Sequence, residues 1–560
     1  MFQIKHKYKY IIPCFFTILL MLVLPMMASA EELAASLNVK PNKTWTITFN
    51  KEVDPASIDS NSIFVLDQFG EKKNGEVTLS ADRKRVLVSP PLEGYTNSET
   101  YTLHITNNIK DKDGNPISTY NTKKFTIEAP GTYDVVNIQS NGTTNIVKSY
   151  ATYGEAVTNL KTDQAIQHNN TFIKIPGGLV VTKATSTNVL TNIYSDKLLT
   201  KVVTYVPSNS ELLYIDSTDA YVEVNVAGNT MYIKQENSNL IPWNAITGRS
   251  YYSTSNGQLV HSIYSSNTGS YSSYQVGTAP IFMISGQKYY SVDGTHFTNA
   301  AGQEVGTSYP YFQYLSARSK TNYTAEEIDT YIMYMLQKLE IDNPTNIMYQ
   351  QATQKSKLIG LGTYLKQIEE TQHINALFIL ALAQHESAYG MSDRAQQYNN
   401  LFGLYVTDNN PLAKYFGTVE QNINELVTAF LNKNYLPPNA GYANGAVFGN
   451  KAIGINLKYA SDPFWGAKAA GHLYRIDQMM GGKDSITPYK LGITTTTGLN
   501  VRTGPGTEYA AAYRYTNSRM PITILDDNLP ESDWIKVLSD SSSYEELYIH
   551  RSYVQELPLY

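Results

Sequence analysis

Residues 375–390, with the sequence NALFILALAQHESAYG, decide the fold of the middle of this 560-residue chain. Asn375 is a good N-cap residue, and residues 376–383 are apolar on every side of a helix, which predicts a buried helix. Gly390 is the expected stop signal. Glu386 is therefore expected to emerge from a buried helix near its C-terminal end.

Glu386 has the position of a general acid. Burial and the negative end of the helix dipole both disfavour a carboxylate and raise its pKa, which suits a group that protonates a glycosidic oxygen. A lone Glu at a helix end is more often a solvated surface residue, so further signals are needed. A zinc motif would require a second His at position 389, which is Tyr389, and no metal or cofactor is predicted.

Three blocks downstream supply those signals: NNLFGL at 399–404, DNNP at 408–411 and YASDPFW at 459–465. Together with AQHESAYGMS at 383–392, they resemble, in the family's order, the catalytic region of glycoside hydrolase family 73. This family comprises bacterial β-N-acetylglucosaminidases of the autolysin type. The likeness predicts a catalytic domain at residues 321–484, within a helical stretch that opens with a capping box formed by Thr324 and Glu327.

The resemblance implies a lysozyme-like, mainly α-helical lobe with a groove for a glycan strand. It implies that Glu386 is the catalytic acid and that Tyr459 assists by positioning or by stabilising charge. The implied reaction is endo-cleavage of the β-1,4 bond between N-acetylglucosamine and N-acetylmuramic acid in peptidoglycan.

The candidate substrate-binding residues come from the same blocks. Asn400 and Phe402 would shape the floor of the site, although core packing also explains Phe402. Asp462 and Trp465 could line the groove, although Asp462 before Pro463 also fits a helix start. The further candidates are Asp408 and Glu420. The family often has an aromatic residue before the matching Asp, whereas this chain has Thr407, which weakens a role for Asp408.

The second catalytic group stays open. An inverting enzyme needs a second carboxylate about 6.5–9.5 Å from the acid, and Asp408, Glu420 and Glu425 are candidates. The alternative is attack by the 2-acetamido oxygen of the sugar itself, with one acid and Tyr459 as helper. Substrate assistance is slightly favoured.

The first 30 residues have the pattern of a signal peptide. Lys5, Lys7 and Lys9 precede an apolar run over 11–24, and Ala28-Ser29-Ala30 forms a cleavage site. An uncleaved anchor is the alternative, disfavoured because the run is short for a spanning helix. Cys14, the only cysteine, lies in this segment, so no disulfide is expected. The sequence predicts a secreted protein with no membrane segment after cleavage.

Residues 31–129 predict a β-sandwich. Trp45 and Ile47 alternate with threonines, and similar runs follow at 62–67, 86–89 and 101–106. The phrase at 49–54, FNKEVD, resembles bacterial Ig-like modules. The DKDG sequence at 111–114 is interpreted as a turn rather than as part of a calcium loop, because no bidentate Glu follows at loop spacing.

The remaining modules are β-rich. We expect a small β-α-β module at 130–185, a degenerate SH3-like module at 186–243 and a connector of unassigned fold at 244–320, all plausible as scaffold. Residues 498–506, GLNVRTGPG, resemble the opening of bacterial SH3 domains, which implies a barrel at 491–560 that binds wall peptide. The overall class is multidomain α+β: an Ig-like β-sandwich, central β modules, a mainly α catalytic domain and an SH3-like barrel.

Charge limits the partners. The net charge is −5 and no basic tract is present, which argues against nucleic acid. The expected partner is peptidoglycan, with non-covalent attachment to the wall. The rival functions are a muramidase or lytic transglycosylase on a related fold, and a surface protein that binds glycan without cleaving it.

Overall fold

The computed structural model describes residues 31–560 except 74, 117–118, 129–130, 186–188, 407–413 and 531–532. The chain forms two compact units, Met1–Gly131 and Thr132–Tyr560, which are treated separately here. The expected signal peptide, residues 1–30, lies outside the described residues. No helix in the described part of the chain combines the length and the apolar character needed to cross a bilayer.

The first unit is a two-sheet sandwich. One sheet has the order β1-β7-β6-β3 and the other β2-β5-β4. The strands are β1 (Glu31–Val39), β2 (Trp45–Thr48), β3 (Ile63–Asp67), β4 (Val77–Leu79), β5 (Arg85–Val88), β6 (Thr100–Ile105) and β7 (Asn121–Ile127). The rings of Trp45 and Phe125 pack 4.9 Å apart in the shared core. The Asp111 carboxylate accepts the backbone N–H groups of Asp113 and Asn115, which forms the expected turn.

The second unit begins with four antiparallel strands in the order β11-β10-β8-β9 and one helix. Their bounds are β8 (Tyr133–Ile138), β9 (Thr144–Tyr150), α1 (Tyr153–Thr158), β10 (Gln164–His168) and β11 (Thr171–Lys174). The expected β-α-β arrangement is therefore incomplete, because a hairpin precedes the helix. The second strand of this hairpin, β9, is an exposed edge strand with mostly polar residues. It therefore shows no alternating hydrophobic pattern in the sequence.

A seven-stranded sheet follows in the order β14-β13-β17-β16-β15-β12-β18. The strands are β12 (Gly178–Thr182), β13 (Leu190–Tyr194), β14 (Val202–Pro207), β15 (Glu211–Ser217), β16 (Tyr221–Val226), β17 (Asn229–Lys234) and β18 (Ser238–Pro242). The expected boundary at residue 185 is displaced. β12 pairs with β15 and β18, so this module begins by Gly178 rather than at residue 186.

The connector contains two small sheets and a short helix. They comprise β19 (Tyr251–Ser255), β20 (Gln258–Ser265) and β21 (Ser270–Thr278), then β22 (His296–Thr298), β23 (Glu304–Thr307) and α2 (Tyr311–Tyr314). Tyr252 and Phe297 are buried in its core, and the His261 ring stacks on Tyr252 at 4.0 Å. The sequence predicts β structure here but no particular fold.

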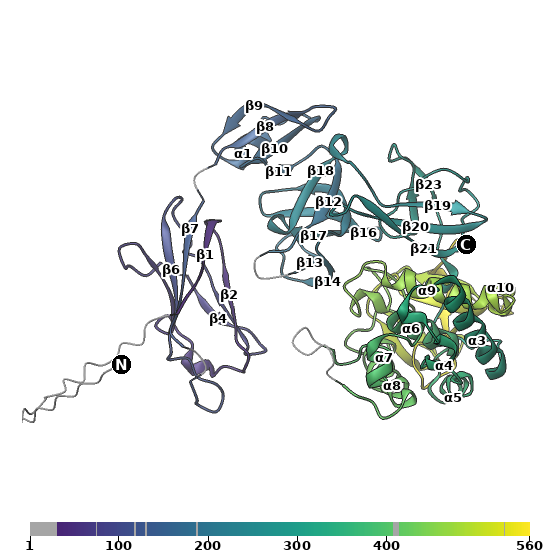
Figure 1. The fold of residues 1–560 in the computed structure, drawn as a ribbon. Coiled ribbons are helices and arrows are strands. Elements are labelled where there is room, and N and C mark those ends of the chain that lie inside the picture. The colour runs from purple at the N-terminus through teal and green to yellow at the C-terminus, as the bar shows by residue number, and fades with distance from the viewer. Residues whose placement is uncertain are drawn as a thin grey trace, which may run out of the picture. The chain divides into compact units, whose positions relative to one another are not determined.

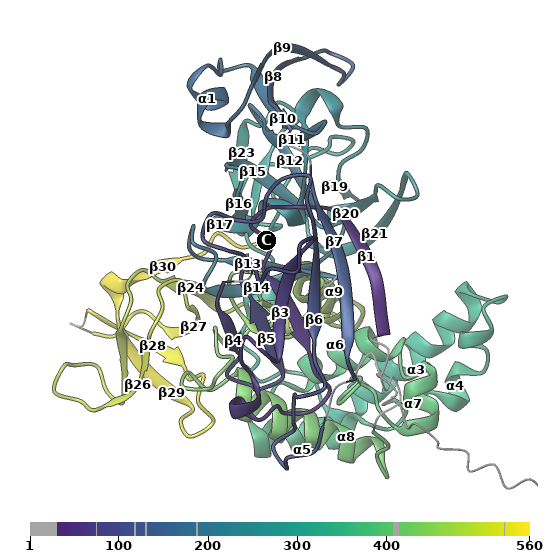
Figure 2. The same ribbon diagram turned by 90° about the vertical axis from the view of Figure 1, so that its left-hand side faces the viewer.

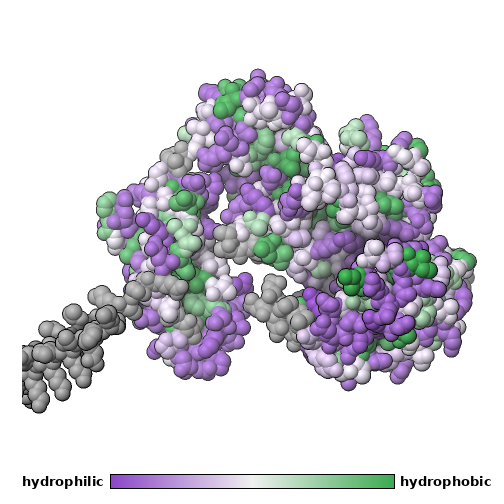
Figure 3. All heavy atoms as spheres, viewed as in Figure 1, coloured by the Kyte–Doolittle hydropathy of each residue, from purple (hydrophilic) through white to green (hydrophobic). Residues whose placement is uncertain are grey.

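The helical region surrounds α6, which lies in the middle of the helices (Figure 1). The helices are α3 (Ala325–Asp342), α4 (Ala352–Lys355), α5 (Gly362–Gln372), α6 (Ala376–Ser387), α7 (Asp393–Tyr398), α8 (Val419–Glu425), α9 (Trp465–Met479) and α10 (Lys483–Ile486), with a π-helical stretch at Leu426–Tyr435. Thr324 and Glu327 form the expected capping box. On the face that Figure 3 shows, the surface over the helices is mostly hydrophilic, and hydrophobic residues lie scattered.

The chain returns to strands in a second seven-stranded sheet, with the order β26-β25-β29-β28-β27-β24-β30. The strands are β24 (Lys490–Thr494), β25 (Leu499–Arg502), β26 (Ala511–Tyr515), β27 (Pro521–Asp526), β28 (Trp534–Leu538), β29 (Glu546–His550) and β30 (Val554–Glu556). This sheet lies beside the helical region, in yellow in Figure 2. Thr523 in β27 accepts the backbone N–H of Ser316, which joins the two regions.

Candidate active site

Glu386 is held by the helix that the sequence predicts. The Asn375 side chain caps α6 by accepting the N–H of Phe378, and every residue from Ala376 to Gln384 is buried. The Phe378 ring stacks on Phe448 at 3.9 Å. Because α6 is tightly packed in the core, the backbone position of Glu386 is fixed.

The helix ends earlier than expected. Ser387 is its last residue, and Ala388, Tyr389 and Gly390 all have positive φ, at 49°, 59° and 77°. The Gln384 carbonyl accepts the N–H groups of Ala388 and Tyr389, which ends the helix before the glycine. A left-handed non-glycine residue costs about 1–2 kcal/mol, and such strain concentrates at functional sites.

The Glu386 side chain is partly buried, and its carboxyl accepts a hydrogen bond from Trp465. The Trp465 indole Nε1 donates to Glu386 Oε1 at 2.7 Å. Desolvation by burial raises the pKa of Glu386, whereas the Trp465 hydrogen bond and the Arg394 charge lower it and the Asp462 charge raises it. The net effect is a raised pKa, which favours the protonated form that a general acid needs.

Tyr459 lies beside this pair. Its ring centroid is 4.7 Å from that of Trp465, at an angle of 33°. Burial, together with the charge of Glu386, raises the pKa of Tyr459 well above its ordinary value. Its hydroxyl therefore stays protonated and can act as a neutral donor next to the acid.

Trp465 is too buried to line a groove, whereas Asp462 is partly exposed and also fits the helix-start interpretation. Trp465 is 4% exposed and packs between Tyr459 and Phe448, so it supports Glu386 from below. Asp462 accepts the Phe464 N–H in the turn before α9 and pairs with Lys468 at 2.6 Å. Asp462 thus acts at the start of the helix and also adds negative charge near Glu386.

Asn400 and Phe402 are both buried. The Asn400 amide bonds to both backbone polar groups of Leu404, to the Lys414 carbonyl and to Asn422. Phe402 belongs to the helical core. Their contacts are those of residues that shape the loop at 399–404, and the packing interpretation of Phe402 fits the structure.

Of the candidates for a second carboxylate, the structure describes Glu420 and Glu425. Asp408 lies outside the described residues. Glu420 and Glu425 line a separate surface pocket of about 490 Å³ that does not include Glu386. Glu425 accepts from Tyr405 Oη at 2.5 Å and from Lys414 at 3.2 Å, and the Tyr405 hydrogen bond foremost lowers its pKa. Of these carboxylates and Asp462, it is Asp462 whose charge acts on the pKa of Glu386.

Two cations near the site are absent from the sequence-based predictions. Arg394, in the first turn of α7, lowers the pKa of Glu386 through its charge. The buried Lys451 donates to the carbonyls of Asn456 and Ala460, which brackets Tyr459, and burial lowers the pKa of Lys451 to about 7. Isolated cations without a motif give no signal in a single sequence.

Two neighbouring histidines, His385 in α6 and His472 in α9, are neutral at neutral pH. The rings of His385 and His472 lie 5.6 Å apart. Burial lowers the pKa of His385 to about 4 and that of His472 well below its ordinary value. Within the described residues, no group of three or more His, Cys, Asp or Glu side chains is arranged to hold a metal ion.

The loop that carries Tyr459 is also held by the first seven-stranded sheet. Thr204 Oγ1 in β14 donates to the Leu457 carbonyl at 2.6 Å, and Tyr205 Oη donates to the Lys458 carbonyl at 3.0 Å. The β14 edge is therefore part of the support of the site.

Comparison with protein families identifies two parts of the chain. Residues 362–478 match the family of mannosyl-glycoprotein endo-β-N-acetylglucosaminidases. The chain contains a glucosaminidase domain. Residues 26–127 match the bacterial Ig-like domain family, which agrees with the sandwich of the first unit and with the sequence-based prediction.

Two curated relatives from Streptococcus pneumoniae strains TIGR4 and R6, both named endo-β-N-acetylglucosaminidase, are 37% identical over 202 residues. The alignments cover 36% of this chain and 26% and 25% of the relatives. The chain thus spans about a quarter of the length of these relatives.

Similar solved structures include a catalytic mutant of Staphylococcus aureus autolysin E in complex with the disaccharide NAG-NAM. It is 16% identical, with a TM-score of 0.23, over 31% of this chain and 76% of that one. The N-terminal part of the bacterial S-layer protein SbsC is 15% identical, with a TM-score of 0.17, over 38% and 44%. Both superpositions are too poor to add to the sequence match of the glucosaminidase domain.

Proposed function

We propose that this protein is an exported peptidoglycan hydrolase, an endo-β-N-acetylglucosaminidase that cuts on the reducing side of N-acetylglucosamine. Glu386 is its general acid. The observation that carries the proposal is the position of the partly buried Glu386 at the end of α6, where desolvation raises its pKa. The match of the glucosaminidase domain and the names of the two relatives support the substrate class.

In the proposed mechanism, Glu386 gives its proton to the oxygen that leaves with muramic acid. The Trp465 indole then stabilises the carboxylate that forms, because a hydrogen bond to the charged state favours that state. This arrangement keeps the acid protonated in the ground state and stabilised after proton transfer.

The nucleophile in this proposal is the 2-acetamido oxygen of the N-acetylglucosamine unit. It bonds to the anomeric carbon as the glycosidic bond breaks, and water activated by the Glu386 carboxylate later opens the resulting ring. Asp462 is ion-paired with Lys468, which supports one-acid chemistry over a free second carboxylate. The Tyr459 hydroxyl would hold the acetamido group or the developing charge.

Substrate assistance and an inverting pair of carboxylates predict different stereochemical outcomes, which one product analysis can distinguish. Substrate assistance gives net retention at the anomeric carbon, whereas an inverting pair gives inversion. Proton NMR of products sampled within the first turnovers distinguishes them, before the anomers equilibrate. We expect the β-anomer; an initial α-anomer would require a second carboxylate.

The remaining parts of the chain are proposed to bring the enzyme to its substrate. Residues 1–30 would direct export, and the C-terminal module would bind wall peptide as an SH3-like domain. A tethered enzyme meets its polymer at a higher local concentration without any change in chemistry.

The direct test is digestion of purified peptidoglycan by the mature chain, with products identified by mass spectrometry after borohydride reduction. New reducing N-acetylglucosamine ends are expected. Reducing muramic acid ends would indicate a muramidase, and anhydro-muramic ends a lytic transglycosylase. Binding to the wall without any new ends would indicate a non-catalytic surface protein.

A further inference from the structure

A second concave site lies away from Glu386, between the connector, the helices and the last residues of the chain. It is a pocket of about 360 Å³ lined by β21, α2, the C-terminal half of α9, α10 and residues 559–560. Tyr474 in its wall comes nine residues after Trp465 on α9, which is about 13 Å along the helix axis. The pocket is therefore distinct from the proposed catalytic centre.

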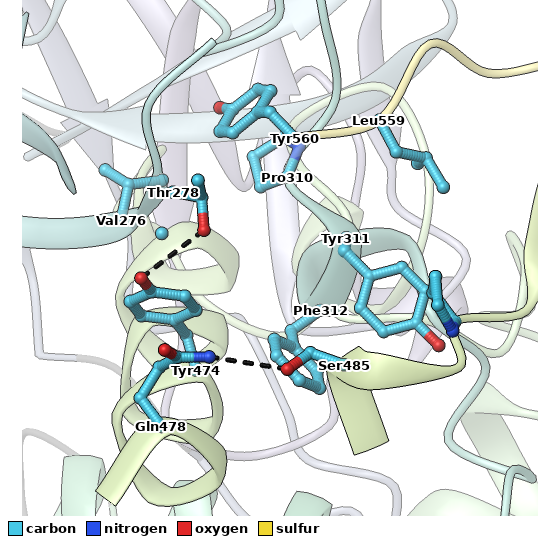
Figure 4. Close-up of a pocket in the computed structure, with 12 residues that line it drawn as sticks. Val276, Thr278, Pro310, Tyr311, Phe312, Tyr474, Gln478, Ser485, Leu559 and Tyr560 are labelled. Atoms are coloured by element: carbon cyan, nitrogen blue, oxygen red, sulfur yellow. Dashed lines mark hydrogen bonds between the residues drawn. The ribbon is translucent and has the colours of Figure 1, made fainter. Parts of the chain in front are cut away.

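The inner wall of this pocket is aromatic. Figure 4 shows the rings of Tyr311, Phe312, Tyr474 and Tyr560 around the pocket, contributed by three separate segments. Tyr311, Phe312 and Tyr474 are largely buried, so their rings are held in place by the surrounding core. Rigid aromatic side chains provide apolar contact area at a low cost in conformational entropy.

The rim is polar and exposed. Thr278 Oγ1 donates to Tyr474 Oη at 3.4 Å, and Gln478 Nε2 donates to Ser485 Oγ at 3.3 Å, as the dashed lines in Figure 4 mark. Both distances are long for hydrogen bonds of these types, so these groups lose little when they turn to a ligand. Hydroxyl and amide groups can each donate and accept.

None of the twelve lining residues has a charged side chain. A stem peptide carries carboxylates and a phosphate polymer carries anions, and either would lose hydration in this pocket without an opposite charge to compensate. An N-acetylated sugar is neutral, has one apolar ring face and has hydroxyl and amide groups at its edge. Its chemistry matches an aromatic wall with a hydroxyl and amide rim.

We propose that this pocket is a second carbohydrate site, which takes an uncharged, N-acetylated sugar unit of a glycan strand while Glu386 works elsewhere on the polymer. The inference rests on the proposed function for its substrate class. A strand held at two places dissociates more slowly. The site would therefore raise the rate at which long strands are hydrolysed and leave the hydrolysis of short oligomers unchanged.

The test counts binding sites in the full chain with the Glu386→Gln substitution, which prevents hydrolysis. The probe is chitotetraose, a β-1,4 tetramer of N-acetylglucosamine, titrated by calorimetry and native mass spectrometry. Gln478→Trp on α9 and Thr278→Trp on β21 each place a large side chain in the pocket, from two different elements. Met479→Trp is the matched control, because Met479 is the next residue on α9, is 39% exposed and does not line the pocket.

Two bound tetramers are expected for the parent and for the Met479→Trp variant, and one for each pocket-filling variant, with affinity at the lost site reduced at least about tenfold. With Glu386 intact, Gln478→Trp should slow the digestion of whole walls and leave short-oligomer cleavage unchanged. A single site in the parent, or two sites in both pocket-filling variants, would overturn the proposal. Failure of the proposed function would instead appear as an absence of glycan cleavage by the unsubstituted chain.

Discussion

The two seven-stranded sheets of this chain have the same strand order but different contacts with the glucosaminidase domain. If β12–β18 are matched in sequence to β24–β30, every neighbour in one sheet corresponds to a neighbour in the other. A short 3-10 helix precedes the last strand in both, at Gln235–Asn237 and at Arg551–Tyr553. The same topology therefore occurs twice in the second unit.

Their contacts lie at opposite ends of α6. The first sheet uses Thr204 and Tyr205 to hold the loop before Tyr459, near the Glu386 end. The module of the second sheet contacts the buried Arg318, which donates to the Asp540 carbonyl. Arg318 also donates to the carbonyls of Gln372 and His373, just before α6 begins. One sheet thus supports the site and the other supports the start of the helix that carries the acid.

The comparison shows that topology and docking are decided by different residues. Buried alternating positions build each sheet, whereas a few hydroxyl or charged groups at one edge or loop decide what it packs against. The expected effects of substitution should differ accordingly: large on stability at one end of α6, and mainly on activity at the other.

The largest stability effect is expected at the second sheet. Arg318→Ala removes a donor from several buried acceptors and should lower the free energy of unfolding by about 3–5 kcal/mol. Denaturant unfolding monitored by tryptophan fluorescence measures this change. The control is Arg514→Ala, at an exposed arginine in β26 of the second sheet, with an expected effect below about 0.5 kcal/mol. Similar changes in the free energy of unfolding for the two variants would show that Arg318 does not anchor the second sheet.

Next in size is the indole that supports the acid. Trp465→Phe keeps an aromatic ring but loses the hydrogen bond to Glu386 Oε1, so kcat should fall about 10- to 100-fold with little change in KM. That bond lowers the pKa of Glu386, so its loss should also move the alkaline limb of the pH–rate profile upward. The control is Trp243→Phe, at an exposed tryptophan directly after β18. An unchanged alkaline limb would mean that the bond does not act on the acid.

How far the sequence predicts this site can be judged from particular residues. The apolar run 376–383 and the cap Asn375 predict α6 and its burial because both depend on local chemistry. The end of α6 at Ser387 was not predicted. There the Ser387 hydroxyl donates to the Ala383 carbonyl and accepts the Gly390 N–H, and no periodicity reveals such an arrangement.

Contacts between residues that are far apart in the sequence are the other feature that the sequence does not predict. The supporting role of Trp465 depends on an approach between residues 79 positions apart, and the two sheets meet the helices through single side chains from distant segments. The topology of the module at 178–242 follows its alternating strands, but its start was misplaced because β12 pairs with strands that come much later in sequence.

Charges around Glu386 should shift its pKa in opposite directions. Activity requires the protonated acid and therefore falls as pH rises through this pKa. Asp462→Asn removes a charge that raises the pKa, so the alkaline limb should move down; Arg394→Met removes a charge that lowers it, so the limb should move up. Each shift should be about one pH unit or less. Profiles of kcat/KM on a soluble glycan give both values, and shifts of the same sign would refute the electrostatic account.

The smallest effect is expected where the first sheet docks. Thr204→Val removes one hydrogen bond to the Leu457 carbonyl and should cost about 1 kcal/mol of stability. Because this bond holds the Tyr459 loop, kcat/KM should fall several-fold in the same variant. Thr230→Val, at an exposed position of the same sheet, is the matched control. Loss of stability without loss of activity would make the two sheets equivalent supports.

The most direct test of the central claim compares wall digestion by the mature chain with that by its Glu386→Gln variant, which keeps the size and shape of the side chain. The account predicts reducing N-acetylglucosamine ends from the unsubstituted protein and a loss of about 10²–10⁴ in rate in the variant, with the same unfolding midpoint. Equal rates in the two proteins would contradict the assignment of Glu386 as the acid.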